Sequence, residues 1–210
     1  MKPSLLLEAC VEDYAQAKKA WDLGAHRLEL CMNLNEGGLT PSYGFIEKVQ
    51  QTIFIPSSVM IRAKAGPFTA TVDELDIMQK DIEVCKKLNV YGVVFGLLTP
   101  KKTIDIEAIK KLVIASKPMA VTFHMAFDQI EDKKEALEQL VELGVDRVLT
   151  KGGKLSAMDG KEILKDLIIQ AQNRIVVMPG GKVTNDNVNE IATYTGAIEL
   201  HGTKIVGQLI

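Results

Sequence analysis

The sequence predicts an α/β fold, a (β/α)8 TIM barrel with eight parallel strands. Short β-branched or leucine-rich runs alternate with longer stretches of helical periodicity, and Gly, Pro, Asn or Thr separate them. Strands joined by helices of about 10–18 residues must pair in parallel through right-handed crossovers. No Gly-x-Gly-x-x-Gly turn follows the first run, which disfavours an open dinucleotide-binding sheet. Eight such units therefore favour a closed barrel.

The expected strands are the most apolar short segments of the chain. They cover residues 5–10, 27–31, 59–62, 92–95, 120–124, 147–150, 175–179 and 197–201. The expected helices lie between them, near residues 12–23, 42–52, 71–89, 105–116, 131–143, 158–172 and 184–193. The third helix has the clearest pattern, because one apolar stripe recurs at steps of three and four residues, formed by Leu75, Met78, Ile82, Cys85 and Leu88.

The helix ends are marked by residues suited to capping. Gly24 and Gly144 follow the first and fifth helices, where a left-handed residue closes the last turn. Thr71 and Glu74 form a capping-box pattern at the start of the third helix, and Thr184 is placed to cap the seventh.

No linker or shift in composition divides the chain, so residues 1–210 are expected to form a single TIM-barrel domain. Nine residues follow the eighth strand, so the final helix of the barrel is expected to be missing. The side of the barrel between the last and first strands would then be under-covered. This predicts a homo-oligomer, with a dimer favoured.

Composition restricts the class of protein. The 25 Lys and Arg residues nearly balance the 27 Asp and Glu residues, for a net charge of −2. This balance argues against nucleic acid or an anionic membrane surface as the main partner. The first ten residues lack the apolar stretch of a signal peptide, and three cysteines are an odd number. A reduced, cytoplasmic protein is the expectation.

Polar side chains gather at the carboxyl ends of the strands, where TIM barrels place their sites. The candidates for catalysis at this mouth are Glu8, Glu29, Arg62, His124, Asp128, Glu199 and His201. Buried charges are unfavourable unless they are paired. One interpretation is a structural network in which Arg27 and Arg62 neutralise Glu8 and Glu29. The favoured interpretation is a functional cleft, because so many ionisable groups converge on one rim.

Two cysteines lie at the ends of neighbouring strands. Adjacent parallel strands run about 4.8 Å apart, so the sulfurs of Cys10 and Cys31 would meet if the register allowed it. A pair of thiolates suits a soft ion such as Cu(I). The alternative is that these cysteines only fill space, since cysteine is among the most buried residue types. A shift of one residue in either strand would separate the sulfurs, and the sequence does not fix that register.

Glycine-rich turns follow the sixth and seventh strands, at Gly152, Gly153, Gly180 and Gly181. Backbone amides in such turns can bind an anion, and the loop after strand seven is a common phosphate position in TIM barrels. The alternative is that these glycines only permit tight turns.

Several segments together resemble the CutC family, whose members are known as copper homeostasis proteins. They read LEACVE, RLELCMNLNEGGLTPSYG, GVVFGLLT, TFHMAFD, DRVLTKGG, VMPGG and IELHG, between residues 5 and about 202. The resemblance implies a (β/α)8 barrel, a cytoplasmic location, oligomers and a role in copper binding or trafficking. The family's proposed copper cysteines match Cys10 and Cys31.

Three departures from the usual family pattern lie near the mouth. Ala63 and Lys64 stand where Pro and Arg are usual, Met125 replaces Arg, and Lys151 replaces Ser. A lysine does not reproduce the two-pronged hydrogen bonding of arginine, so these changes weaken an anion site shared across the family. Met125 adds a soft sulfur, but it follows the inward His124, so strand alternation places it outward.

The resemblance makes copper homeostasis the predicted function, with Cu(I) as cofactor. The residues alone favour a different class, an enzyme of isomerase or hydrolase type that acts on a small anionic molecule, such as a phosphorylated one. In that alternative His124 transfers the proton, with Glu8, Glu29 or Glu199 as its partner, and Arg62 holds an acidic group.

Overall fold

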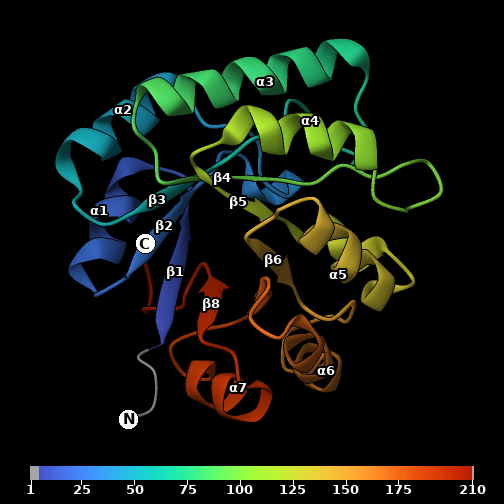
Figure 1. Ribbon diagram of the computed structural model, residues 1–210. Helices are drawn as coiled ribbons and strands as arrows, with labels where there is room; N and C mark the ends of the chain where they lie inside the picture. Colours follow the sequence, from blue (N-terminus) through green and yellow to red (C-terminus); the bar gives the residue numbers. More distant parts are fainter. Residues whose placement is uncertain (1–4, 210) are drawn as a thin grey trace.

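Eight parallel strands form a nearly closed barrel with seven α-helices around it (Figure 1). The structure is a computed structural model that describes residues 5–209. The strands are β1 (Leu6–Val11), β2 (Arg27–Leu30), β3 (Ser57–Met60), β4 (Gly92–Phe95), β5 (Ala120–Phe123), β6 (Arg147–Thr150), β7 (Val176–Pro179) and β8 (Glu199–Gly202). The helices are α1 (Tyr14–Asp22), α2 (Tyr43–Thr52), α3 (Val72–Lys87), α4 (Ile106–Ser116), α5 (Lys133–Glu142), α6 (Lys161–Ala171) and α7 (Val188–Thr195).

The predicted fold class is confirmed, including the missing final helix, since residues 203–209 contain only turns and a bridge. Two short 3-10 helices, η1 (Leu34–Glu36) and η2 (Met125–Gln129), lie in the loops after β2 and β5. Within the described range, every helix is too short or too polar to cross a bilayer. The third strand lies two residues earlier than predicted, so Arg62 belongs to the loop that follows it.

The sheet runs in the order β7-β6-β5-β4-β3-β2-β1-β8, and all of its ladders are parallel. Strands β7 and β8 lie against each other without a ladder. The loops beyond them join instead, because Thr184 bridges to Lys204 and the amide of Asn185 donates to the Lys204 carbonyl at 3.0 Å. Thr184 therefore does not cap α7, which begins later, after Asn187. Its predicted role was wrong because Thr184 is held at the barrel seam.

The other predicted caps are present. Gly24 and Gly144 have φ angles of +89° and +75°, in the left-handed region that glycine tolerates best. Thr71 and Glu74 form both bonds of the capping box at the start of α3. The predicted apolar stripe of α3 faces the core, with Met78, Ile82 and Cys85 buried and Leu75 and Leu88 packed beside them.

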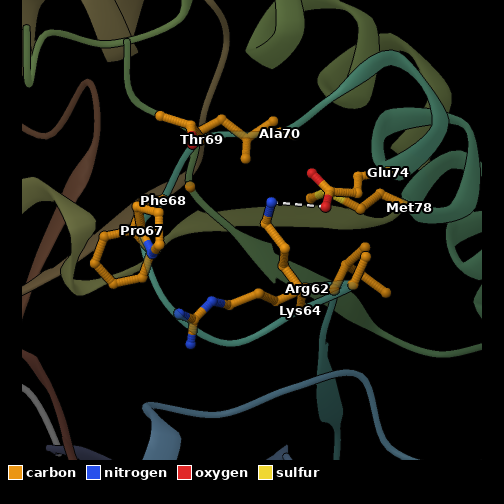
Figure 2. A pocket seen from close by; sticks show the side chains of 12 residues that line it. Arg62, Lys64, Pro67, Phe68, Thr69, Ala70, Glu74 and Met78 are labelled. Carbon is orange, nitrogen blue, oxygen red and sulfur yellow. Dashed lines mark ion pairs between the residues drawn. The ribbon is translucent and has the colours of Figure 1, made fainter. Parts of the chain in front are cut away.

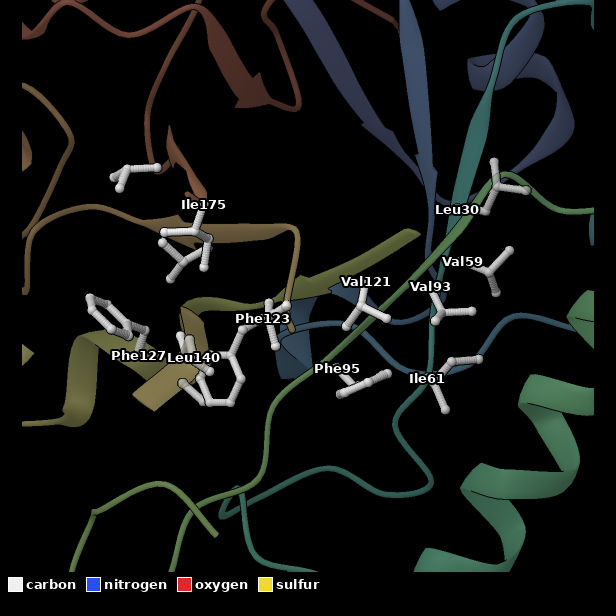
Figure 3. Close-up of a cluster of buried hydrophobic side chains, with 14 of the residues drawn as sticks. Leu30, Val59, Ile61, Val93, Phe95, Val121, Phe123, Phe127, Leu140 and Ile175 are labelled. Atoms are coloured by element: carbon white, nitrogen blue, oxygen red, sulfur yellow. The ribbon is translucent and has the colours of Figure 1, made fainter. Parts of the chain in front are cut away.

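Strand alternation divides the buried side chains into two groups. One set faces outward from the barrel and packs against the helices, and Figure 3 shows part of it, including Val59, Val93 and Val121 from neighbouring strands and Leu140 from α5. The other set faces inward. Because each strand has period two, every second residue is enclosed by the barrel regardless of its polarity.

The inward-facing set includes a charged network toward the amino ends of the strands, below the mouth of the barrel. Arg27 on β2 is buried and forms ion pairs with Glu8 on β1 and with Glu199 on β8, the latter at 2.6 Å. Arg147 on β6 also reaches Glu199, at 2.8 Å, and donates to the Tyr91 hydroxyl at 2.8 Å. Burial alone would raise the pKa of Glu199, but Arg147 and Arg27 outweigh it and lower that pKa. The network thus fills the barrel with matched charges.

Replacing Arg27 by methionine should destabilise the barrel strongly, because Glu8 loses its cation and keeps its buried position. Removing one partner of a buried ion pair reduces the free energy of unfolding by about 3–5 kcal/mol. The measurement is urea unfolding followed by circular dichroism. Lys18→Met is the control, since Lys18 pairs with Asp22 on the solvent-exposed face of α1. Equal midpoints for Arg27→Met and the wild type would show that the network contributes nothing to stability.

Candidate functional site

A cavity of about 260 Å³ lies at the carboxyl ends of the strands, the predicted location of the site. Its lining combines apolar walls with a polar floor. The lining residues are Cys10, Glu29, Leu34, Gly37, Met60, Phe68, His124, Met125, Leu149, Gly181, Lys182, His201, Gly202 and Thr203. Strands and loops from most of the barrel therefore contribute to one hollow.

Cys10 and Cys31 converge at the bottom of this cavity. Their sulfurs are 3.7 Å apart and both residues are buried, in a small cluster with Met60, Val94 and Leu34. In the ladder, Cys10 lies opposite Glu29 and not opposite Cys31. The tilt and coiling of barrel strands bring side chains of different register positions together. The question that strand spacing left open is thus decided by the closed barrel.

The carboxylate of Glu29 lies close to the two sulfurs. The potential ligand atoms of Cys10, Cys31 and Glu29 all lie within 4.8 Å of one another. Glu29 also accepts a 2.8 Å hydrogen bond from His201, and its other oxygen is buried without a partner. Burial would raise the pKa of Glu29, but the charge of His201 outweighs it and lowers that pKa to about 2. Glu29 raises the pKa of His201 in turn, against the opposing effect of burial, so the two form an ion pair.

Both thiols are held in the protonated state. The pKa of Cys10 is raised by its hydrogen bond to Cys31, by burial and by the negative charge of Glu29. For Cys31, the hydrogen bond to Cys10 acts in the other direction, but burial and Glu29 outweigh it and raise the pKa to about 12. The floor therefore carries no net charge when no metal is bound, since Glu29 and His201 cancel.

His124 is a neutral imidazole on the wall of the cavity. Its Nδ1 accepts a hydrogen bond from the amide of Ala126 at 3.1 Å, and its ring packs against Phe68 with centroids 4.9 Å apart. Burial, and then the charge of Arg62, lower the pKa of His124 to about 4. A Cβ atom at Gly96 would lie 2.6 Å from Nδ1 of His124, so only glycine leaves room for this ring. Gly96 was not among the predicted site residues, and the signal that marks it in the sequence is a glycine directly after a strand.

Arg62 holds two loops together and does not pair with Glu29. The interpretation in which Arg62 helps to neutralise Glu29 is therefore wrong. Its guanidinium donates to three carbonyls, those of Glu36 at 2.8 Å, Gly38 at 3.1 Å and Gly66 at 2.7 Å. It also lies over the ring of Phe68, 4.8 Å from the centroid. The loops after β2 and β3 are thereby tied together at the rim.

Figure 2 shows Arg62 and Phe68 around a narrow pocket next to the main cavity. Here Lys64, one of the departures from the family pattern, forms a 2.7 Å ion pair with Glu74 at the start of α3. Lys64 therefore stabilises the loop after β3 and is not free to hold a ligand. Met125, expected to face outward, lines the main cavity, because η2 ends the alternation of β5 before this residue.

Asp128 organises the loop after β6. Its carboxylate accepts from the Thr150 hydroxyl at 2.6 Å, the Lys151 amide at 3.2 Å and the Gly153 amide at 2.7 Å. The Gly152 amide donates to the Thr150 hydroxyl at 3.0 Å. The amides of both glycines are therefore engaged within the protein.

The two glycines of the turn after β7, Gly180 and Gly181, have different roles. The Gly180 amide donates to the Thr150 carbonyl at 3.0 Å, whereas Gly181 lines the cavity with a φ of +83°. A side chain at Gly180 would meet Leu149 at 2.5 Å. Close packing accounts for Gly180, and of these four glycines only Gly181 faces the candidate site.

The predicted residues thus separate into three groups. Cys10, Cys31, Glu29, His124 and His201 come together around the cavity. The remaining acidic residues and the arginine do not join them: the ion-pair network below holds Glu8 and Glu199, and loop contacts hold Arg62 and Asp128.

The neutral state of His124 should make stability depend on pH. The unfolded chain takes up a proton near the ordinary pKa of about 6.5, whereas the folded protein resists until about pH 4. Stability should therefore fall by up to about 3 kcal/mol between these values as the pH decreases. His124→Asn removes the titrating group and keeps an acceptor for the Ala126 amide. The measurement is the free energy of unfolding in urea, determined from pH 7 to 4 for the wild type and the variant. An equal loss of stability in both proteins would contradict the neutral state of His124.

The chain matches a known protein family. The CutC family model matches residues 5–206. A copper homeostasis protein cutC homolog from Homo sapiens is 45% identical over 196 residues, covering 93% of this chain and 72% of the relative. A CutC family protein from Parabacteroides distasonis is 43% identical over 197 residues, covering 93% and 81%.

Solved structures agree with these matches. The crystal structure of CutC from Streptococcus agalactiae has a TM-score of 0.92 at 38% identity, covering 96% of this chain and 99% of that one. An aldolase has a TM-score of 0.74 at 11% identity, covering 97% and 92%, which shows a shared fold alone. With the family model matched over nearly all of its length, this chain belongs to the CutC family.

Proposed function

We propose that this protein binds copper(I) as its cargo, through the thiolates of Cys10 and Cys31 at the bottom of the barrel mouth. The observation that carries this proposal is the 3.7 Å separation of the two sulfurs. Metal–sulfur bonds are about 2.3 Å long, so both sulfurs can reach one ion. Thiolates are soft ligands that favour Cu(I) over hard cations. Relatives named for copper homeostasis support the assignment.

The surroundings of the sulfurs fit a soft ion. Met60 belongs to the same buried cluster and supplies a thioether, a further soft donor. Glu29 has a carboxylate oxygen within 4.8 Å of both sulfurs, which offers a third ligand, and one of its oxygens is buried without a partner. Because both thiols are protonated without metal, binding must release their protons.

The acid–base alternative receives less support from the contacts. Two of its three candidate glutamates, Glu8 and Glu199, are neutralised by arginines below the mouth. Glu29 is paired with His201. No carboxylate in the described chain forms a hydrogen bond with His124, the expected proton-transfer group. Copper binding is therefore the single proposal for the cysteine pair.

Anaerobic titration with Cu(I) against a competing chelator tests this proposal. The wild type should bind one ion per chain, and Cys10→Ser or Cys31→Ser should each weaken binding by more than about 100-fold, since changes even to groups that only support a ligand cost 10–100-fold. Cys85→Ser is the matched control, because Cys85 is also buried but belongs to α3. Equal affinities for all four proteins, or binding no tighter than that of a free thiol, would overturn the proposal.

A further inference from the structure

The cavity is much larger than a copper site requires. Its volume of about 260 Å³ compares with roughly 30 Å³ for one water molecule in the liquid. The cysteine pair occupies only the floor, and Cys31 is fully buried beneath the lining. Most of the hollow above the sulfurs is therefore available to another molecule.

Two buried imidazoles face this hollow with an atom that lacks a partner. Because Nδ1 of His124 accepts from the Ala126 amide, the neutral ring carries its proton on Nε2, which has no acceptor among the described residues. On the other side, Nε2 of His201 is committed to Glu29, and Nδ1 is buried without a partner. Nδ1 of His201 is fully buried, whereas Nε2 of His124 keeps accessible surface at the cavity that the ring lines. Buried polar groups without partners are uncommon and call for a ligand.

The charges around the mouth favour an anion. Lys182 is an exposed lining residue and forms no ion pair within residues 5–209. Glu29 is the carboxylate among the lining residues, and it is paired with His201. Among the charged residues that line the cavity, Glu29 and His201 cancel each other, which leaves the positive charge of Lys182.

The rest of the lining is apolar. Side chains of Leu34, Met60, Phe68, Met125 and Leu149 form the walls. A bare inorganic anion would leave these walls unfilled, whereas an apolar body would remove them from water.

We propose that the cavity binds a small organic anion, with an oxyanion head held by His124 and Lys182 and an apolar body against the walls. The anion would occupy the part of this cavity above the cysteine pair, and its binding does not depend on copper. The recognised chemistry is an anionic oxygen group on a compact apolar body. A carboxylate and a phosphate ester both provide it, and the experiment distinguishes them.

Calorimetric titration of the metal-free protein with phenylacetate and with phenyl phosphate tests the proposal. Phenylacetamide and phenethylammonium keep the ring but remove or invert the charge. At least one anion should bind, and should bind at least about 10-fold more tightly than either control compound. The stronger of the two anions identifies the head group. Saturable binding of neither anion, or equal binding of all four probes, would overturn the proposal.

Variants then locate the site. His124→Asn keeps the acceptor for the Ala126 amide but lacks Nε2, and Lys182→Met keeps most of the side-chain length without the charge. Each should weaken binding of the preferred anion by about 10-fold. Lys110→Met is the matched control, because Lys110 is exposed on α4 away from the lining. Unchanged affinity in both test variants would place the anion elsewhere and refute this site.

Two further measurements separate this proposal from copper binding. Cys10→Ser should keep its affinity for the anion even if it loses Cu(I). Circular dichroism spectra and urea midpoints of His124→Asn and Lys182→Met show whether any loss of affinity comes from unfolding. If a folded Cys10→Ser variant loses anion binding as well, the two sites are one and the proposal of a separate site is wrong.

Discussion

The buried guanidinium of Arg27 is the constraint on which the interior of this barrel depends. It lies among inward-facing side chains from neighbouring strands, and it compensates Glu8 and Glu199 at once. A barrel of eight short strands has an interior that side chains must fill. Here that filling is partly ionic, and a buried charge is tolerated only with its partners in place. The ladder register that sets Glu8 opposite Arg27 is therefore fixed by electrostatics as well as by hydrogen bonds.

A second ion pair, between Glu29 and His201, lies nearer the mouth on the same strands that carry the network. Each of these two ion-paired groups is close to neutral. Because His201 balances the charge of Glu29, the two protonated thiols can lie beside this carboxylate. The sulfurs of Cys10 and Cys31 are thus brought together by the geometry of two adjacent strands, and both cysteines are free thiols. A preformed arrangement of this kind reduces the entropy lost when a ligand binds.

The departures from the family pattern alter the rim more than the floor. Lys64 pairs with Glu74 and stabilises the loop after β3, while Met125 adds an apolar side chain and a sulfur to the cavity wall. The two cysteines, Glu29, His124 and His201 are unaffected by these changes. The rim therefore differs from the usual family sequence, whereas the floor keeps the residues that the resemblance implies.

The order of elements was determined by the sequence itself. Periodicity, capping residues and glycine stops are local properties, so the alternation of strands and helices, the capping box at Thr71 and the stripe on α3 were all predictable. The family resemblance also pointed to Cys10 and Cys31 from their flanking motifs.

Only the tertiary structure decided which polar side chains share a site. Glu8 and Glu29 look equivalent in sequence, since each lies two residues before a cysteine, yet both differ in partner: Glu8 pairs with Arg27 and Glu29 with His201. The same holds for Gly96, which makes room for His124, and for Met125, which η2 turns into the cavity. These contacts join residues far apart along the chain, and they depend on the register and tilt at which the barrel closes. Strand periodicity fixes which face a side chain takes, but not which side chains it meets across the barrel.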